Sequence, residues 1–245
     1  MNKDKHLHII SFDIPYPPSY GGVIDVYYKI KAFSDAGIKI HLHCFEYGRK
    51  HSAELEQICE SVTYYQRKTS WIYFFQKLPY IVASRDSHTL IKHLEMDSYP
   101  ILMEGLHSCF LLKEKRFLHR RLIVRTHNIE HEYYENLFKV ERHLLKKIYF
   151  YIESKKLAYF EKELCRAGLV ASISRHDHRY FSAFLNNVCH IPAFHPFEEI
   201  QVLEGKGKFA FYHGNLSVGE NNEAALYLVN EVFNDIEIPL SLIHI

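Results

Sequence analysis

The segment LHIISFDIPYPPSYGGVIDVYYKIKAFSDAGIKIHLHCF, residues 7–45, holds the most informative pattern in the chain. Residues 7–12 are a short apolar run that predicts a buried strand, and the proline- and glycine-rich residues 13–22 predict a loop. Residues 23–36 carry apolar side chains at helical spacing, and Gly37 stands where a glycine commonly ends a helix. A second apolar run follows this glycine. The order strand, loop, helix, strand predicts two parallel strands joined by a crossover helix.

The alternation of strands and helices continues to about residue 191. Further strands are predicted at residues 38–45, 62–65, 101–103, 122–125, 169–173 and 188–191. Further helices are predicted at residues 54–60, 71–78, 87–95, 141–166 and 176–184. This pattern is typical of an α/β fold, so we expect a Rossmann-like domain with a mostly parallel sheet.

The character of the sequence changes after this domain. The segment AFHPFEEIQVLEGKGK, residues 193–208, has one proline, two glycines and mixed charge, which is typical of an inter-domain linker. Beyond it we predict a strand at 209–213, a glycine loop, a helix at 222–233 and a strand at 236–239. We therefore expect an N-terminal domain over residues 1–195, a linker over 196–207, and the truncated start of a second Rossmann-like domain over 208–245. This last part is too short to bury a core of its own.

Composition excludes several classes of protein. The chain has 47% hydrophobic and 24% charged residues, as a globular protein does, and no apolar run of the roughly 18 residues that a spanning helix needs. The N-terminus also lacks the apolar core of a signal peptide, so we expect a cytoplasmic protein. A net charge of +1 gives no electrostatic basis for binding nucleic acid. Five scattered cysteines without a CxxC pair indicate reduced thiols.

Gly21 and Gly22 form the first candidate site. Glycine lets the backbone approach a ligand closely, and a helix N-terminus offers free N–H groups to an anion. The spacing is not GxGxxG, so the dinucleotide-binding fingerprint is absent. A loop that merely needs positive φ angles is the structural alternative.

The segment RTHNIEH, residues 125–131, forms the second candidate site. HNIEH fits the H-x-x-E-H zinc pattern, but His127 directly follows a predicted strand, so His131 is expected to point elsewhere. No third ligand is evident, and we expect no metal. His127 can instead bind hydroxyl groups or move protons at the carboxyl edge of the sheet, or it merely caps a turn.

Two further features have open interpretations. Glu104, at another strand end, could bind hydroxyl groups or cap a helix that begins near His107. The predicted helix 141–166 carries seven basic residues among aromatic and aliphatic ones, so it could lie on an anionic membrane surface, although a core helix with solvated lysines has the same pattern.

Four segments together resemble a known family. They are residues 13–45, RTHNIEHEYY at 125–134, GLVASISRHDHRYF at 168–181 and FYHGNLSVGENNEAALYLV at 211–229. In this order they resemble the N-terminal part of a GT-B glycosyltransferase of family 4, of the bacterial mannosyltransferase-like kind. The resemblance extends to about Pro239, and the order of the segments is more specific than any one of them.

The resemblance implies two Rossmann-like domains that face each other across a cleft, with the acceptor on the N-terminal domain and a nucleotide-sugar on the C-terminal one. Members usually retain the anomeric configuration and need no metal, so no cofactor is expected. Gly21 and Gly22 match the glycine loop, which lies over the donor diphosphate and near the acceptor. His127 matches the cleft histidine near the transferred sugar, and we count Asn128 and Glu104 with the ligand-binding residues. The triplet Gly214, Asn215 and Leu216 matches a loop that faces the donor phosphates.

The sequence departs from the family at two points. Ser217–Asn221 lacks the basic residue that often follows this loop, which puts one phosphate contact in doubt. The Glu-x7-Glu motif that grips the donor falls beyond residue 245, so the fragment alone is expected to be inactive.

The resulting expectation is a hexosyltransferase that moves a sugar, with mannose as a candidate, from a nucleotide-sugar to a glycan or lipid-linked acceptor, with retention. The setting would be polysaccharide assembly in the cytoplasm, at the inner face of the membrane if there is peripheral membrane contact. Two alternatives remain open: a lone acceptor-binding module without catalysis, and a GT-B sugar-nucleotide epimerase.

Overall fold

The protein is described from a computed structural model, which covers residues 5–202 and 204–244. The chain divides into two compact units, residues 1–130 with 156–196 and residues 131–155 with 197–245.

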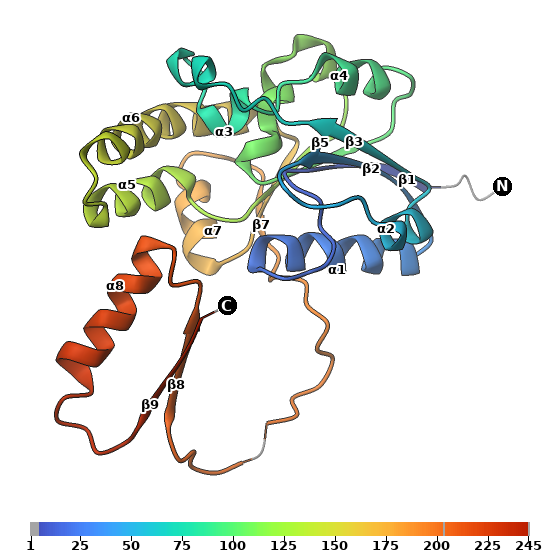
Figure 1. Cartoon of the computed structure of the whole chain (residues 1–245). Coiled ribbons are helices and arrows are strands. Elements are labelled where there is room, and N and C mark those ends of the chain that lie inside the picture. Colours follow the sequence, from blue (N-terminus) through green and yellow to red (C-terminus); the bar gives the residue numbers. More distant parts are fainter. Residues whose placement is uncertain (1–4, 203, 245) are drawn as a thin grey trace. The chain divides into compact units, whose positions relative to one another are not determined.

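The first unit is built on a sheet of seven parallel strands (Figure 1). Its strands are β1 (Lys5–Ser11), β2 (Ile38–Glu46), β3 (Ser61–Gln66), β4 (Ile101–Glu104), β5 (Leu122–Thr126), β6 (Leu169–Ser172) and β7 (Val188–His190). Their spatial order is β3-β2-β1-β4-β5-β6-β7, and every neighbouring pair is parallel. The predicted α/β class with a Rossmann-like parallel sheet is therefore confirmed. The strand order reverses between β1 and β4, and ligands bind at such switch points in open α/β sheets.

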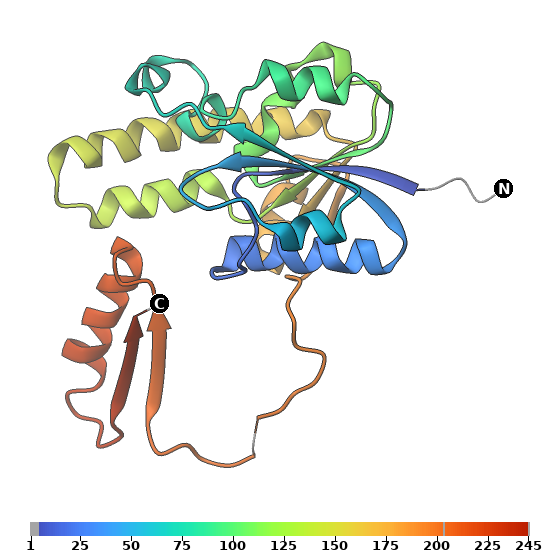
Figure 2. The ribbon, with the colours of Figure 1, turned by 45° about the vertical axis from the view of Figure 1, so that its right-hand side comes forward.

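Helices cover both faces of this sheet. Figures 1 and 2 show α1 (Gly21–Asp35) and α2 (Ala53–Ile58) on one side and α3 (Tyr80–Ala83) and α4 (His88–Leu94) on the other. The remaining α-helix that lies wholly in this unit is α7 (Arg175–Ser182). Short 3₁₀ helices span η1 (Trp71–Phe75), η2 (Leu106–Lys113), η3 (Lys115–Phe117) and η4 (Glu161–Arg166).

The position of α1 follows from its apolar spacing. Val23, Val26, Tyr27 and Ile30 are buried, and the last three belong to one core cluster with residues of β1 and β2. The helix ends at Asp35, and Gly37 follows with a φ of 75°, a conformation that glycine adopts without strain. The predicted glycine cap is confirmed. This packing fixes the first turn of α1 at the carboxyl edge of the sheet.

The second unit holds parts of two helices and a small sheet. The helix α5 (Glu130–Val140) begins in the first unit, and α6 (Leu144–Phe160) ends there. The strands β8 (Ala210–Gly214) and β9 (Leu240–His244) are parallel, and α8 (Gly219–Tyr227) with a π-helical turn η5 (Leu228–Val232) connects them. This is the strand, helix, strand beginning that the sequence predicts for a second Rossmann-like domain.

Some predicted elements are wrong in their bounds or type. The strand placed at 236–239 is found at Leu240–His244, because Pro239 has no N–H to donate to a ladder and only its carbonyl pairs, with the N–H of Ala210. The helix placed at 71–78 is a five-residue 3₁₀ turn that stops before Pro79. The helix placed at 141–166 is α6 followed by the 3₁₀ helix η4. The helix α5 was not predicted.

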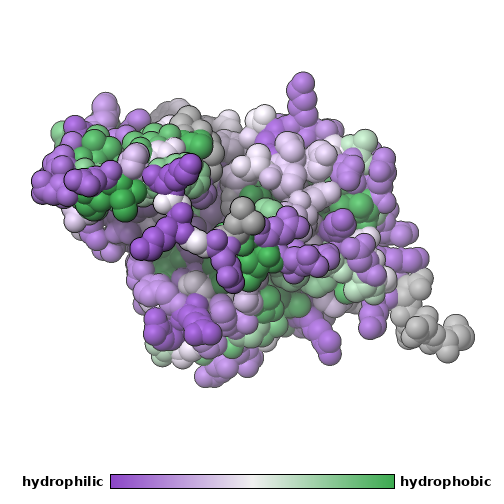
Figure 3. Space-filling view, turned by 90° about the horizontal axis from the view of Figure 1, so that it is seen from below, coloured by the Kyte–Doolittle hydropathy of each residue, from purple (hydrophilic) through white to green (hydrophobic). Residues whose placement is uncertain are grey.

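The surface is mixed in character. Figure 3 shows one face, where hydrophilic residues predominate and hydrophobic ones form separate patches. Within the described residues, none of the helices has the length and apolar character needed to cross a membrane.

Candidate active site

The candidate site lies where β1, β4 and β5 end, at the switch point of the sheet. Glu104 is the last residue of β4, and it pairs in register with Arg125 of β5. His127 comes one residue after β5, and Phe12 comes one residue after β1. Because the strands are parallel, these residues share one edge, together with the start of α1.

A buried ionic network joins α1 to the ends of β4 and β5. The Lys29 ammonium lies 2.8 Å from a carboxylate oxygen of Asp25, one helical turn away, and 3.0 Å from the Glu104 carboxylate. The Arg125 guanidinium donates to both oxygens of Asp25, at 2.9 and 3.1 Å. Asp25 and Glu104 have no exposed surface, and Lys29 and Arg125 are 3% and 1% exposed. Two carboxylates and two cations therefore neutralise each other away from water.

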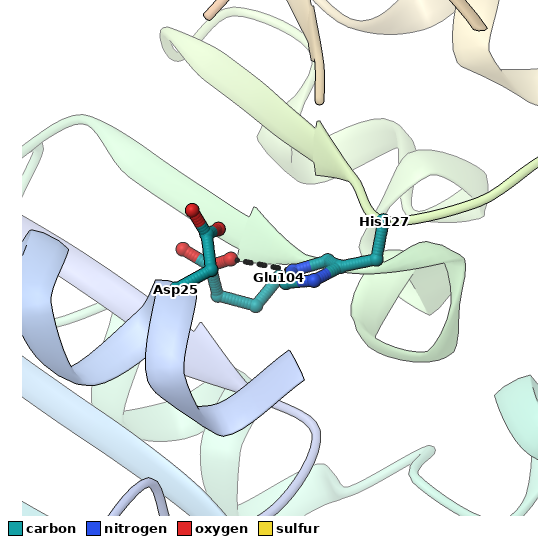
Figure 4. A group of neighbouring side chains, drawn as sticks. All are labelled: Asp25, Glu104 and His127. Carbon is teal, nitrogen blue, oxygen red and sulfur yellow. Dashed lines mark hydrogen bonds and ion pairs between the residues drawn. The ribbon is translucent and has the colours of Figure 1, made fainter. Parts of the chain in front are cut away.

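The network ends on His127. Its Nε2 lies 3.0 Å from a Glu104 oxygen, and Figure 4 shows the ring reaching toward Glu104 from the end of β5. An ionised Glu104 only accepts, so Nε2 donates to it, and in the neutral form of the ring Nδ1 keeps a lone pair. The His127 side chain is 9% exposed. The arrangement gives one ring nitrogen to the protein and leaves the other for a ligand.

The electrostatics keep both carboxyl groups ionised. Burial alone would raise the pKa of Asp25, but the hydrogen bonds and charges of Arg125 and Lys29 hold that pKa far below its usual range. Burial likewise opposes ionisation of Glu104, and Lys29 together with His127 lowers its pKa below the ordinary value. Glu104 is thus a permanent acceptor for His127.

Asp25, Glu104 and His127 also approach one another closely enough to suggest a metal site. One ligand atom from each lies within 4.8 Å of the others. However, Lys29 already contacts both carboxylates and Arg125 binds Asp25, so the two negative charges have cationic partners. The donor set does not favour a divalent ion. The H-x-x-E-H zinc pattern is not supported either, because this group of neighbouring potential ligands contains His127 but not His131.

Gly21 and Gly22 open α1, as expected. Tyr20 precedes them without a side-chain cap, and the first turn has no acidic residue, so its N–H groups are not occupied by a carboxylate. Neither glycine has a positive φ, so the alternative that they serve a left-handed loop is wrong. A Cβ on Gly22 would stand 2.9 Å from the Phe12 ring, whereas one on Gly21 would meet nothing within 4 Å. Gly22 is required by close packing, and Gly21 faces open space.

Phe12 connects the glycines to the histidine. Its ring centroid lies 5.4 Å from that of His127 and 5.3 Å from that of His107. Gly22 and His127 therefore contact the same aromatic ring from different elements. The structure brings these two predicted residues and Glu104 together within the first unit.

The other predicted residues have different surroundings. Glu104 does not cap the helix after it: Gly105 occupies the N-cap of η2, so that alternative is wrong. Its full burial favours an indirect role, in which it orients His127. Asn128 is exposed, and its side chain hydrogen-bonds Glu130. Gly214 is the last residue of β8, in the second unit, and Asn215 and Leu216 lie in the turn that leads to α8, where the Asn215 side chain accepts from the Ser217 N–H at 3.0 Å.

An open hollow adjoins the loop before α1. It has a volume of about 560 Å³ and is lined by Tyr16, Pro17, Ser19, Arg49, Lys50 and His51 with residues 52–54. Part of its lining is the same proline-rich loop that leads to Gly21, and the basic Arg49 and Lys50 outnumber the one acidic lining residue, Glu54, which favours an anionic ligand.

Sequence reasoning missed Asp25, Lys29 and the role of Arg125. A signal was present, because Asp25 and Lys29 stand four residues apart on the apolar face of a helix between Val23 and Ile30. Charged residues are almost never fully buried unless they are paired, so two of opposite sign on such a face predict a buried ion pair.

Comparisons with known proteins find a curated relative by sequence and solved structures of similar fold. No family model matches the chain. A protein of Klebsiella pneumoniae, described as an uncharacterized 44.6 kDa protein in the cps region, is 27% identical over 232 residues, which are 91% of this chain and 59% of that protein. This chain thus spans about three-fifths of the length of the curated relative.

Solved structures of glycosyltransferases resemble the chain. A UDP-glucosyltransferase from Polygonum tinctorium, capable of glucosylating indoxyl, is 10% identical with a TM-score of 0.51, over 94% of this chain and 65% of that one. MurG of Acinetobacter baumannii is 12% identical with a TM-score of 0.46, over 98% of this chain and 58% of that one. The likeness to the UDP-glucosyltransferase shows the fold, a Rossmann-like parallel sheet of the GT-B kind.

Proposed function

We propose that this chain is part of a glycosyltransferase that moves a hexose from a nucleotide-sugar to a glycan or lipid-linked acceptor. The observation that carries the proposal is the buried network of Asp25, Lys29, Arg125 and Glu104, which fixes His127 at the switch point of a GT-B sheet. The cps region named for the Klebsiella relative supports a setting in polysaccharide assembly.

His127 serves as a positioning group for a sugar hydroxyl in this proposal. Glu104 holds the proton on Nε2, so Nδ1 accepts the hydrogen of a hydroxyl group. A fixed acceptor raises the rate mainly by orienting the reacting group, since correct placement removes much of the entropic barrier. The buried salt bridges allow His127 little freedom to turn.

The start of α1 supplies the second chemical element. Sugar transfer from a diphosphate donor leaves negative charge on the departing phosphate. Backbone N–H groups at Gly21 and Gly22 would stabilise this charge without a metal, because in the described part of the chain no side chain caps this helix start and Gly21 faces open space. Metal-free transfer with retention, and mannose as the sugar, belong to this proposal.

The second unit would contribute to the donor side. Gly214 ends β8, Asn215 and Leu216 begin the turn that leads to α8, and a strand-to-helix turn presents N–H groups to phosphate. Contact with the inner face of the cell membrane, where lipid-linked acceptors are found, is also part of the proposal.

The test uses the complete protein with a panel of radiolabelled nucleotide-sugars and the polysaccharide precursor lipids of the source cell. We expect His127→Ala to lower turnover at least ten-fold, which corresponds to about 1.4 kcal/mol of transition-state stabilisation. The matched control is His119→Ala, which removes an exposed histidine outside the site. Circular dichroism verifies that both variants fold.

Three results would contradict the proposal or its details. Equal turnover in the two variants would remove His127 from the mechanism. Release of a free sugar epimer would indicate an epimerase, and acceptor binding without any turnover of a donor would indicate a binding module.

A further inference from the structure

A second histidine lies at the same edge and has no role in the mechanism above. His107 stands three residues beyond the end of β4, and Gly105 separates that strand from the helix η2 that carries it. Like His127, it lies beside the Phe12 ring. A Cβ placed on Gly105 would come within 4 Å of both histidine rings. The two rings therefore line the same small region of the switch point.

The two nitrogens of His107 have different surroundings. Nδ1 is buried and has no hydrogen-bond partner among the residues that the structure describes, although a quarter of the side chain is exposed. The exposed part of the ring is thus the side away from Nδ1, which carries Nε2. A buried nitrogen without a partner is costly and calls for a group that compensates it.

Glu130 is the group that faces this nitrogen. Its Oε1 lies 3.8 Å from His107 Nδ1 and is likewise buried without a hydrogen-bond partner. The side chain is 3% exposed, and Asn128 donates to its carboxyl group. The two orphaned atoms face each other, at a distance that a small side-chain rotation shortens to a hydrogen bond.

The surroundings of the pair favour neutral forms of both groups. Burial and the nearby Glu161 and Asp177 raise the pKa of Glu130 to about 8, against the opposing effects of Asn128 and Arg85. Burial and the positive charges of Arg85 and Arg67 lower the pKa of His107 well below its usual value, as does His127. A protonated Glu130 directs its O–H at Nδ1, which leaves the ring proton of His107 on Nε2.

We propose that His107 is a second sugar-binding residue, whose Nε2–H donates to a hydroxyl group, and that Glu130 is the positioning residue that orients its ring. This inference deepens the proposed function and rests on it. His127 offers an acceptor and His107 a donor at one edge, so the pair matches two neighbouring hydroxyl groups of a pyranose. One hydroxyl gives its hydrogen to His127, and the next accepts from His107.

The test follows the histidine nitrogens by long-range ¹H–¹⁵N NMR of the full chain. Methyl α-D-mannopyranoside is the probe, and its permethylated derivative is the control, because it keeps the ring but has no hydroxyl hydrogen for His127 and carries a bulky methyl group on the oxygens that His107 would contact. We expect His107 in the Nε2–H form before any addition. The probe should then shift the signals of both His107 and His127, and the control should shift neither.

Variants at Glu130 separate orientation from packing. Glu130→Gln keeps a side-chain N–H donor for Nδ1, so we expect the Nε2–H form and probe affinity to be retained. Glu130→Leu has similar volume but no donor, so we expect mixed tautomers and an affinity about ten-fold weaker, the worth of roughly one hydrogen bond. The tautomer of the unaltered protein decides the question of orientation if Glu130→Leu does not fold.

The outcomes distinguish a failure of this inference from a failure of the proposed function. A response of His127 without one of His107 overturns this inference and leaves the proposed function standing. No response of either ring overturns both. An Nδ1–H form of His107 in the unaltered protein, or the same tautomer and affinity in Glu130→Leu, overturns the role of Glu130.

Discussion

Asp25 is the residue on which most of the buried charge depends. It binds Arg125 through both oxygens, Lys29 through one, and the backbone N–H of Phe194 at 2.8 Å. Replacing a buried ion pair by apolar residues is often neutral for stability, so such a network is not explained by stability alone. Its geometric effect is specific here, because it ties α1, two strand ends and the segment after β7 to the carboxylate that orients His127.

Removing the charge of Asp25 should destabilise the fold strongly. In Asp25→Asn the Arg125 guanidinium keeps a hydrogen-bond partner but loses the buried counter-charge that it contacts, and breaking such a pair typically costs about 3–5 kcal/mol. Urea unfolding followed by circular dichroism measures the change. Arg116→Ala is the control, because its ion pairs with Glu95 and Glu114 are exposed and should contribute little. Equal effects of the two variants would contradict the assigned importance of Asp25.

Some residues of the candidate site could be predicted from the sequence and others could not, and the difference has a physical cause. His127 and Glu104 could be found because they stand at strand ends, where polar side chains gather in α/β folds. The role of Arg125 could not, since the three residues before it in β5 are apolar and its partner is 100 residues away in sequence. Glu130 and His107 become a pair only through the packing of η2 against the start of α5, which no spacing rule reveals.

At the scale of elements, β1 and β2 carry a row of buried histidines. His8 Nδ1 lies 2.9 Å from His43 Nε2, and the other His43 nitrogen lies 2.9 Å from the Tyr65 hydroxyl on β3. Asp97 holds the far side of His8 at 3.0 Å. In the register of the parallel strands, His8 is paired with His41. His43 lies two residues further along β2, on the same face of the strand, because side chains alternate between the two faces. The contact between the His8 and His43 rings follows from this alternation.

This row should make the fold sensitive to acid. Burial lowers the pKa of His43 well below 6.5, and that of His8 is lowered too. An unfolded histidine takes up a proton near pH 6.5 while folded His43 does not, so the unfolded state binds more protons and stability falls as the pH drops below about 6.5. Urea unfolding at several pH values should show His43→Gln losing part of this slope, at most about 1.4 kcal/mol per pH unit. His119→Ala should keep it, and an unaltered slope in His43→Gln would refute the assignment.

The start of α6 presents an apolar stripe beside basic residues. Leu144, Leu145, Ile148 and Tyr151 are 46–71% exposed and recur at helical spacing, next to Lys146 and Lys147. Such a stripe binds anionic lipid surfaces by combining apolar burial with charge attraction. This half of the predicted basic helix therefore fits the membrane interpretation, whereas its last turns, with Leu157 and Phe160 buried, fit the core interpretation.

We expect weak binding of the chain to vesicles that contain anionic lipid, lost at high salt because screening shortens the range of the attraction. Leu145→Glu should weaken co-sedimentation, and Leu118→Glu, at an exposed leucine of η3's C-terminal end, should not. Equal sedimentation with neutral and anionic vesicles would contradict the contact. Trp71, the single tryptophan, is 75% exposed in η1, so a blue shift of its fluorescence would locate the contact there instead.

Element predictions succeeded where hydrophobic periodicity was undisturbed. The seven strands of the main sheet and α1 follow apolar runs and spacing that local rules capture. The helix α5 was not predicted, although Tyr134, Leu137 and Phe138 have helical spacing. Its first turn belongs to the polar segment RTHNIEH, which also fits a metal site or a strand-end site. The 3₁₀ character of η1 and η2 depends on neighbouring prolines, glycines and packing, which periodicity does not report.

At the scale of the whole molecule, the connection between the two units is anchored by the buried network. Arg125 donates to the carbonyls of Ile191 and Pro192, and Asp25 accepts from Phe194, so the chain is held until just before residue 195. Beyond this point Phe197, Ile200 and Val202 are 75–93% exposed. The contacts that stabilise the main sheet therefore end close to the predicted linker.

Two truncations test where the first folding unit ends. A chain of residues 1–207 keeps every partner of Asp25 and Arg125, so its Tm should lie within about 2 °C of that of the full chain, since 1 kcal/mol corresponds to about 2–4 °C at this size. A chain of residues 1–187 lacks β7 and residues 191–194 and leaves buried N–H groups of Arg125 without acceptors, so its Tm should fall by more than about 5 °C.

Calorimetry measures the Tm of both truncated chains. Trypsin should also cut the full chain first at Lys206 or Lys208, which are exposed. Equal losses in the two truncations would mean that the main sheet depends on residues 208–245, and the linker would then have to be placed elsewhere.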